Sequence, residues 1–368
     1  MARLGDYVKI RTGKIDANAA SENGQYLFFT CSVEPLKIDT YSFDCECVLV
    51  AGNGDLNVKY YNGKFDAYQR TYIVESIDKS VLSVPYLYCF LNKYVETLRK
   101  QSIGGVIKYI KLGNLTEAQI PLCSLGEQEK IVNILNKVNK VIATRKQQLQ
   151  QLDELVKARF VEMFGDPVYN EMHWEKVPLS VCVESIDNGK SFVCDSVARE
   201  GDWPAILKLS AATYGFYRPE ENKAVLDEIQ IVEDAAVRVG DLLFTRKNTP
   251  ELVGMCAYVY DTPSNLMMPD LIFRLNTTER CNKIFLWKLI NHDLFRVCIQ
   301  AIATGSAKSM SNISKERLLN LEVILPPIEL QEQFAAFVEQ VDKSKFAVQK
   351  ALDEAQTLFD SLMQEYFG

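Results

Sequence analysis

The chain has 368 residues, of which 48% are hydrophobic and 24% charged, so it is long enough for two or three globular domains. It has no run of 18 apolar residues and no apolar leader segment, which predicts a protein of the cytoplasm without a membrane span. A net charge of −7 weakly disfavours a nucleic-acid partner, but the charge is uneven, since residues 328–368 alone hold three Lys or Arg against eight Asp or Glu.

Residues 1–120 are predicted to form a first mixed α/β domain. It opens with a strand in LGDYVKIRTGK (4–14), followed by apolar runs broken by Gly and Asn, such as YSFDCECVLVAGNGDL (41–56). An apolar helix over PYLYCFLN (85–92) then precedes a Gly/Lys loop. After this loop, Asn114 suits a helix N-cap or turn before a short strand.

Residues 121–165 are predicted to form a first long helix, because the stretch from Glu127 onward has no Pro and no Gly before Gly165. Its apolar residues recur in steps of three and four, with breaks at Arg145 and Arg159, which is the heptad pattern of a coiled coil. The core positions predicted from this pattern are Ile131, Leu135, Val138, Ile142, Leu149, Leu152 and Val156.

Residues 166–323 repeat the same order of features. An opening strand ends in Asn-Gly-Lys (188–190), β-rich stretches such as AVRVGDLLFTRKNTPE (236–251) follow, and IFLWKLIN (284–291) is an apolar helix. A Gly/Lys loop and a short strand complete the segment. We therefore expect a second mixed α/β domain.

Residues 324–368 are predicted to form a second long helix. A shift of 203 residues aligns 128–165 with 331–368 without a gap, and 9 of 38 positions are identical, including Gln128/Gln331 and Phe164/Phe367. Together with the parallel order of features, this indicates an internal duplication. The predicted core positions of this helix are Phe334, Val338, Val341, Val348, Leu352, Phe359 and Leu362.

The expected fold class is α+β, with two pseudo-twofold-related mixed α/β domains joined by a long antiparallel two-helix coiled coil. A helix of ~37 residues rising ~1.5 Å each is ~55 Å long, more than a domain of ~130 residues can hide. The alternative is a pair of ordinary core helices.

The sequence offers little for catalysis or metal binding. Ten cysteines are scattered without a CxxC pair, so reduced thiols are expected, and the only histidines are His173 and His292. The chain has no GxxxxGK(S/T) loop and no Ser-His-Asp or Cys-His grouping. We expect no catalytic site and no metal site.

The duplicated pattern resembles the specificity subunit of type I restriction–modification systems. The second helix is entered through ILPPIELQEQF (324–334) and the first through IPLCSLGEQEKI (120–131), where Glu127-Gln128 matches the family's Glu-Gln step. Cys123-Ser124 replaces the family's prolines, and Leu330 stands where its Glu is expected. The resemblance covers the whole chain.

This resemblance implies a non-catalytic DNA-recognition subunit. Each globule would be a target-recognition domain that reads one half of a bipartite, asymmetric site in double-stranded DNA, and the coiled coil would set the spacing. Two adenine-N6 methyltransferase subunits would dock on the helices, with restriction subunits added in the full complex. The chain itself would bind no cofactor, while S-adenosylmethionine would serve the methyltransferase subunits, and ATP and Mg the restriction subunits.

The candidate DNA contacts are polar residues in loops that also contain Gly or aromatic residues, because Arg, Lys, Asn and Gln read base edges and phosphates. They are Lys14, Asn62, Lys64, Gln69, Arg70 and Lys108 in the first globule and Lys190, Arg246, Lys247, Asn248 and Lys308 in the second. The pairs Lys14/Lys190 and Lys108/Lys308 recur in both halves. For any single residue, a solvated loop charge is the alternative. For the whole chain, the alternative is a coiled-coil adaptor without DNA binding, which its acidic net charge would suit.

Overall fold

A computed structural model describes residues 1–226, 231–305 and 310–368. The chain divides into two compact units. Unit 1 consists of residues 1–147 and 349–368, and unit 2 of residues 148–348. Unit 1 is therefore built from two stretches that are far apart in the sequence, whereas unit 2 is continuous.

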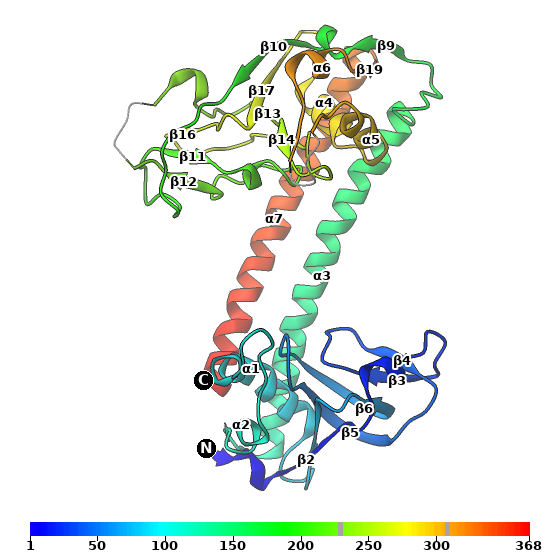
Figure 1. The fold of residues 1–368 in the computed structure, drawn as a ribbon, viewed down its shortest axis with the longest axis vertical. Coiled ribbons are helices and arrows are strands. Elements are labelled where there is room, and N and C mark those ends of the chain that lie inside the picture. The colour runs from blue at the N-terminus through cyan, green and yellow to red at the C-terminus, as the bar shows by residue number, and fades with distance from the viewer. Residues whose placement is uncertain (227–230, 306–309) are drawn as a thin grey trace. The chain divides into compact units, whose positions relative to one another are not determined.

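Unit 1 is built around one curved sheet (Figure 1). All neighbouring strands are antiparallel except β3 and β6. The strand order is β2 (Val8–Thr12), β7 (Thr71–Ser76), β5 (Phe43–Ala51), β6 (Val58–Ala67), β3 (Tyr26–Phe29) and β4 (Leu36–Ile38). Outside this sheet, β1 (Ala2–Arg3) pairs with β8 (Gln119–Ile120).

Both faces of this sheet are buried, and for that reason its central strand is an almost continuous apolar run. Val48 and Val50 of β5 face a core shared with helix α1 (Val84–Gln101), whereas Cys47 and Leu49 face a smaller cluster on the other side. This alternation follows from the two-residue period of a strand. The short helix α2 (Leu112–Thr116) follows α1 in the chain.

Unit 2 repeats the central pairing of unit 1. Its opening strand pairs with its last long strand, which in turn pairs with the central strand, as β2, β7 and β5 do. The four-stranded sheet has the order β10 (Val183–Asn188), β17 (Ile272–Thr277), β13 (Leu242–Thr245) and β15 (Cys256–Tyr258). A smaller sheet has the order β12 (Asn222–Ala224), β11 (Ala205–Leu207) and β16 (Leu266–Met267).

The described residues of unit 2 also form two further strand pairs and three short helices. The pairs are β14 (Lys247–Asn248) with β18 (Ser311–Asn312) and β9 (Glu175–Pro178) with β19 (Glu322–Leu325). The helices are α4 (Lys283–Ile290), α5 (Asp293–Ala301) and α6 (Lys315–Leu319). The chain also has single 3-10 turns at Leu4–Asp6, Ala17–Ala19, Leu179–Val181, Leu209–Ala211 and Glu233–Ala235.

Two helices of 40 residues each, α3 (Leu125–Phe164) and α7 (Ile328–Phe367), contribute to both units. In unit 1 the start of α3 and the end of α7 share one core, which contains Leu135, Met363 and Phe367. In unit 2 the end of α3 and the start of α7 share the other core. Within each unit, the start of one long helix therefore packs with the end of the other.

Aromatic residues at the helix ends anchor both cores. Phe367 lies 5.2 Å from the ring of Tyr86, centroid to centroid, in unit 1. Phe164, its counterpart in the duplication, lies 4.9 Å from Phe285 and 5.4 Å from Phe334 in unit 2. The repeated Phe-Gly at the end of each half thus marks the same packing contact.

One buried glutamine holds the start of each long helix, Gln128 in α3 and Gln331 in α7. In unit 1, Gln128 accepts a hydrogen bond from the backbone amide of Ser83 at 2.9 Å and donates to the carbonyls of Val81 (2.8 Å) and Cys123 (2.9 Å). Both Gln128 and its counterpart Gln331 have no exposed surface. Their amides satisfy backbone groups that would otherwise be buried without a partner.

Candidate nucleic-acid interface

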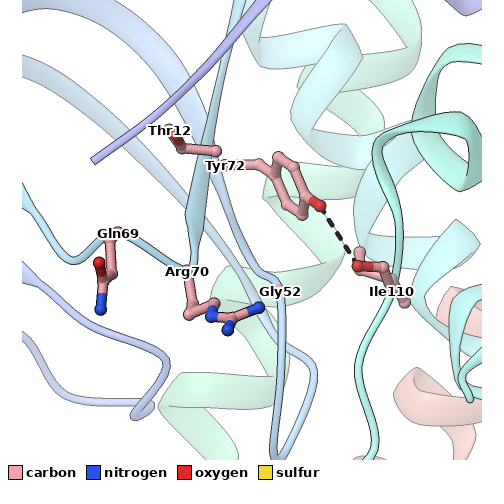
Figure 2. A pocket seen from close by; sticks show the side chains of 6 residues that line it. All are labelled: Thr12, Gly52, Gln69, Arg70, Tyr72 and Ile110. Atoms are coloured by element: carbon pink, nitrogen blue, oxygen red, sulfur yellow. Dashed lines mark hydrogen bonds between the residues drawn. The ribbon is translucent and has the colours of Figure 1, made fainter. Parts of the chain in front are cut away.

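Four of the predicted contacts in the first globule lie around one end of the unit 1 sheet. A hollow of about 270 Å³ there is lined by Thr12, Gly52, Gln69, Arg70, Tyr72 and Ile110, which are drawn in Figure 2. Tyr72 donates from its hydroxyl to the Ile110 carbonyl at 3.2 Å, and burial raises its pKa. This bond joins the first residues of β7 to the loop that carries Lys108.

Close backbone contacts frame this hollow and position the charged side chains. The Gly13 amide donates to the Thr71 carbonyl at 3.1 Å, and a Cβ on Gly13 would lie 2.0 Å from the Ala67 carbonyl oxygen. Only glycine fits so close an approach, so the chain can pass from β2 directly to Lys14 at this edge. The Gly52 amide donates to the Arg70 carbonyl at 2.8 Å and holds the β6–β7 turn on the other side.

The side chains of Lys14, Gln69, Arg70 and Lys108 are exposed. Within the described ranges, no hydrogen bond or ion pair engages the Lys14, Arg70 or Lys108 nitrogens. Three cations and an amide are therefore presented to solvent at one end of the sheet, which is the chemistry required to contact phosphates and base edges.

Of the six candidates in the first globule, Gln69 and Arg70 line this hollow, Lys14 and Lys108 each lie two residues from the lining residues Thr12 and Ile110, and Asn62 and Lys64 lie apart from it. Both are exposed on β6, and Lys64 places its amine 4.6 Å from the centre of the Tyr41 ring. The structure thus brings together four of the six predicted residues and places the other two along a strand.

Unit 2 has a hollow of about 470 Å³ at the corresponding sheet end. Lys190 lines it and donates its backbone amide to the Met268 carbonyl at 2.9 Å. A Cβ on Gly189 would lie 2.0 Å from the Pro269 carbonyl oxygen, so this glycine has the role of Gly13 in unit 1. The repeated Gly-Lys step of the sequence is therefore one structural feature that occurs twice.

Lys208 and Lys223 also line the unit 2 hollow, although neither was among the predicted contacts. Lys208 lies 3.8 Å from the Glu221 carboxylate, and Lys223 is exposed on β12. Lys223 lies in, and Lys208 directly follows, strands of a small sheet, and strands of three residues or fewer leave no periodic signal in the sequence.

The predicted trio Arg246, Lys247 and Asn248 divides into two environments. The Arg246 guanidinium lies 5.1 Å from the centre of the Phe273 ring, and its Nε is buried without a hydrogen-bond acceptor among the described residues. Lys247 is half-buried on β14. Asn248 is buried and donates to the Thr213 hydroxyl at 3.0 Å. Its amide is therefore engaged inside the domain, unlike the exposed side chain that the sequence predicts.

Lys308 lies outside the described residues. The Ile313 amide donates to the Arg246 carbonyl (2.8 Å) as the Ile110 amide does to the Gly52 carbonyl (2.9 Å), so Ile313 corresponds to Ile110. The residue two positions earlier, which is Lys108 in unit 1, is Ser311 in unit 2.

The predicted coiled-coil positions are all buried or half-buried. Leu135, Ile142, Val156, Phe334, Val338 and Val341 are buried, and Ile131, Val138, Leu149, Leu152, Val348, Leu352, Phe359 and Leu362 are half-buried. The heptad pattern did not predict Phe160, Phe164, Met363 or Phe367, which are buried because each helix end turns its side chains toward a domain core.

Over residues 1–226, 231–305 and 310–368, no group of three or more His, Cys, Asp and Glu side chains could hold a metal ion. In the same ranges, the helices are too short or too polar to cross a membrane. All ten cysteines are free thiols, and five of them are buried. His292 packs 5.2 Å from the Phe160 ring, and burial lowers its pKa.

A family model described as type I restriction modification DNA specificity domain matches residues 1–154 and 173–355. Among curated relatives, the chain is similar to the type I restriction enzyme EcoDI specificity subunit of Escherichia coli, with 38% identity over 154 residues, or 42% of this chain and 34% of the relative. It is also similar to the MjaVIII specificity subunit of Methanocaldococcus jannaschii, with 21% identity over 97% of this chain and 91% of the relative. The chain spans about a third of the length of the first two curated relatives it matches.

Two solved structures share the fold. The type I restriction-modification S subunit from M. genitalium has a TM-score of 0.65 and 15% identity, covering 100% of this chain and 95% of that one. A chain from a study of complex assembly and conformational transition in a type I system has a TM-score of 0.53 and 17% identity, covering 100% and 96%. These matches confirm the resemblance inferred from the duplicated helices, since the family model is a DNA specificity domain and the curated relatives are named specificity subunits.

Proposed function

The chain belongs to the family of type I restriction modification DNA specificity domains, and on that premise we propose that it is the DNA-recognition subunit of a type I restriction–modification complex. Residues 1–120 and 166–323 are the two target-recognition domains, and each reads one half of a bipartite, asymmetric DNA site. Residues 121–165 and 324–368 are the spacer helices. We propose that it acts in the cytoplasm.

The observation that carries this proposal is the repeated sheet end. In each unit a Gly-Lys step packs its glycine against backbone carbonyls and leaves an exposed lysine beside a hollow at the strand ends. Different residues line the two hollows, with Gln69 and Arg70 in unit 1 and Lys208 and Lys223 in unit 2. Two similar frames with different side chains suit a site whose halves differ in sequence.

We propose that α3 and α7 pair as an antiparallel coiled coil related by a pseudo-twofold axis and so set the distance between the half-sites. The support is that the start of each helix shares a core with the end of the other in both units. The network in which Lys345 of α7 bonds Asp153 of α3 adds a polar contact between them within unit 2. Forty residues would give a spacer of ~60 Å.

The same helices offer a repeated docking surface for partner subunits. Leu155 and Leu358 are identical positions of the duplication, and they are 47% and 51% exposed. Two equivalent apolar positions suit two copies of one partner. We assign them to two adenine-N6 methyltransferase subunits, which bring S-adenosylmethionine, while the restriction subunits that complete the complex bring ATP and Mg.

Methylation mapping tests the proposal directly. Adenine-N6 methylation is mapped across the genome of cells with and without this chain, and one bipartite, asymmetric motif should disappear in its absence. A duplex that carries this motif should then bind the chain with its methyltransferase subunits, with affinity that falls as salt rises. Matched duplexes with either half scrambled serve as controls. If no motif is lost and no duplex binds, the chain is an adaptor and not a DNA reader.

A further inference from the structure

A closed loop with an apolar tip stands beside the unit 1 hollow. At its base the Ile103 amide donates to the Tyr109 carbonyl (3.0 Å) and the Tyr109 amide donates back to Ile103 (2.9 Å). Gly104 has φ +119°, and a Cβ there would lie 2.5 Å from the Ile107 carbonyl oxygen, so the closure requires glycine. The residues between this base form a short braced projection.

The loop is fixed to the candidate surface on its other side. The Gly54 amide donates to the Lys108 carbonyl at 3.0 Å, and the Ile110 amide donates to the Gly52 carbonyl at 2.9 Å. Gly52 and Ile110 both line the unit 1 hollow. The tip therefore rises from the same end of the sheet as Lys14 and Arg70.

The tip exposes aliphatic side chains where a loop would ordinarily be polar. Val106 is fully exposed, and Ile107 is 63% exposed. Lone exposed apolar residues are common, but here two adjacent ones occupy a braced tip that is followed directly by exposed Lys108. A partner that binds this surface must therefore offer both negative charge and an apolar group.

We propose that Val106 and Ile107 enter a groove of the DNA and contact the bases of one half-site, while Lys108, Arg70 and Lys14 bind the phosphates on either side. This inference rests on the function proposed above. Branched aliphatic side chains gain nothing from phosphates, and the apolar surfaces that duplex DNA offers are the thymine methyl groups and the base faces. The tip is thus a specificity-determining element, and the cations are positioning contacts.

Unit 2 has a similar loop base, and the sequence between its two ends differs. Thr304 and Asn312 exchange two backbone hydrogen bonds of 2.8 Å, and a Cβ on Gly305 would lie 2.7 Å from the Met310 carbonyl oxygen. The intervening letters are Ser-Ala-Lys-Ser followed by Met310, in place of Gly-Val-Ile-Lys. A repeated loop base with a different sequence between its ends suits two readers of unlike half-sites.

The test uses the full chain with its methyltransferase subunits and a duplex that carries the mapped site, titrated at several salt concentrations. The double variant Val106→Ser/Ile107→Ser should weaken binding about tenfold or more with an unchanged slope of log affinity against log salt, because it removes only apolar contacts. Lys108→Gln should instead lower the magnitude of that slope by about one.

Three comparisons complete the design. Val106→Ile/Ile107→Val keeps an apolar tip and should bind within about twofold of the parent chain. Ile77→Ser removes an isoleucine that is also 63% exposed but follows the opposite end of β7, and it should have no effect. On a duplex with one half-site scrambled, the effect of the serine variant should vanish, and it should persist when the other half is scrambled.

Affinity of the serine variant within twofold of the parent chain would overturn this inference and leave the proposed function intact. So would an equal effect on both half-sites. Failure of the parent chain to bind the mapped duplex would instead refute the proposed function, and this inference with it.

Discussion

The Gln331 side chain accepts a hydrogen bond from the backbone amide of Asn282 at 2.9 Å, and Gln128 makes the same bond to Ser83 at the same distance. Both glutamines also donate to two backbone carbonyls, one just before their own long helix and one just before the shorter helix α1 or α4. Each glutamine therefore joins its long helix to the start of the shorter helix of the same unit through backbone groups, which leaves the surrounding side chains free to differ.

Gln128→Leu should lower the free energy of unfolding by about 3 kcal/mol. It leaves one backbone amide and two carbonyls buried without partners, and each unsatisfied group costs about 1–3 kcal/mol before relaxation. Denaturant unfolding followed by circular dichroism measures the loss. Gln150→Leu, at an exposed position of α3, is the matched control and should change stability by less than about 0.5 kcal/mol. Equal effects of the two variants would show that the Gln128 hydrogen bonds do not stabilise the fold.

Phe164→Ala should destabilise unit 2 and Phe367→Ala should destabilise unit 1, and spectroscopy can distinguish the two effects. All three tryptophans, Trp174, Trp203 and Trp287, lie in unit 2, so their fluorescence reports on that unit. Phe164→Ala should lower the free energy of unfolding reported by tryptophan fluorescence by about 3–5 kcal/mol, because it removes a buried aromatic side chain. Phe367→Ala should leave the tryptophan transition in place and lower the stability seen by circular dichroism. If both variants move the tryptophan signal alike, the two units unfold as one.

Lys288→Met should stabilise unit 2 in a pH-dependent way. The Lys288 amine lies 3.3 Å from the centre of the Trp287 ring, and burial lowers its pKa from 10.5 to about 8, although the Asp342 charge opposes the change. Below pH 8 the amine is protonated in both the folded and the unfolded chain, so its burial is fully unfavourable. Between pH 8 and 10.5 the unfolded chain binds more protons, so the stability of the native chain rises with pH.

The advantage of Lys288→Met over the native chain should thus be constant below pH 8 and disappear by about pH 10.5. Its size is on the order of 1–3 kcal/mol. Thermal melts of both proteins across this range measure it, with Lys350→Met on the exposed face of α7 as the control. If Lys288→Met is more stable than the native chain by the same amount at every pH, the gain comes from packing alone.

Arg246→Ala should lower affinity for the cognate DNA and leave the binding of methyltransferase subunits unchanged. The guanidinium is held over Phe273 beside the loop strand β14, and its buried Nε has no acceptor among the described residues. We expect a loss of about 1–3 kcal/mol in DNA binding if Arg246 contacts a base. Fluorescence anisotropy with the mapped duplex measures it, and native mass spectrometry checks assembly. Unchanged affinity would remove Arg246 from the interface.

Removal of one heptad from each spacer helix, residues 143–149 and 346–352, should change the preferred spacing of the half-sites. Seven residues correspond to ~10 Å of helix, or about three base pairs of DNA. A set of duplexes with spacers shortened in single steps should reveal a new optimum with unchanged base preference in each half, or binding should be lost. The original spacing retained at full affinity would contradict the role of these helices in spacing.

The sequence was most informative where a residue has a repeated local task. The 203-residue shift, the heptads, and the Gly-Lys steps at Gly13 and Gly189 can all be read from the sequence because each occurs twice in the same order. Asn248 shows the limit, because its burial depends on the pairing of β14 with β18, more than sixty residues away. Val106 and Ile107 were not singled out, since an apolar pair in a loop has the same letters as a core strand and only the structure shows that it is exposed.

The discontinuity of unit 1 has a consequence for biosynthesis. Its core needs Phe367, which the ribosome adds only after the whole of unit 2, residues 148–348, has been made. Unit 2 is continuous and can close first, although domains ordinarily fold in the order in which they are synthesised. During translation, Tyr86 and Phe90 therefore lack their contacts with Phe367, and the core of unit 1 stays incomplete until the last residues of α7 are made.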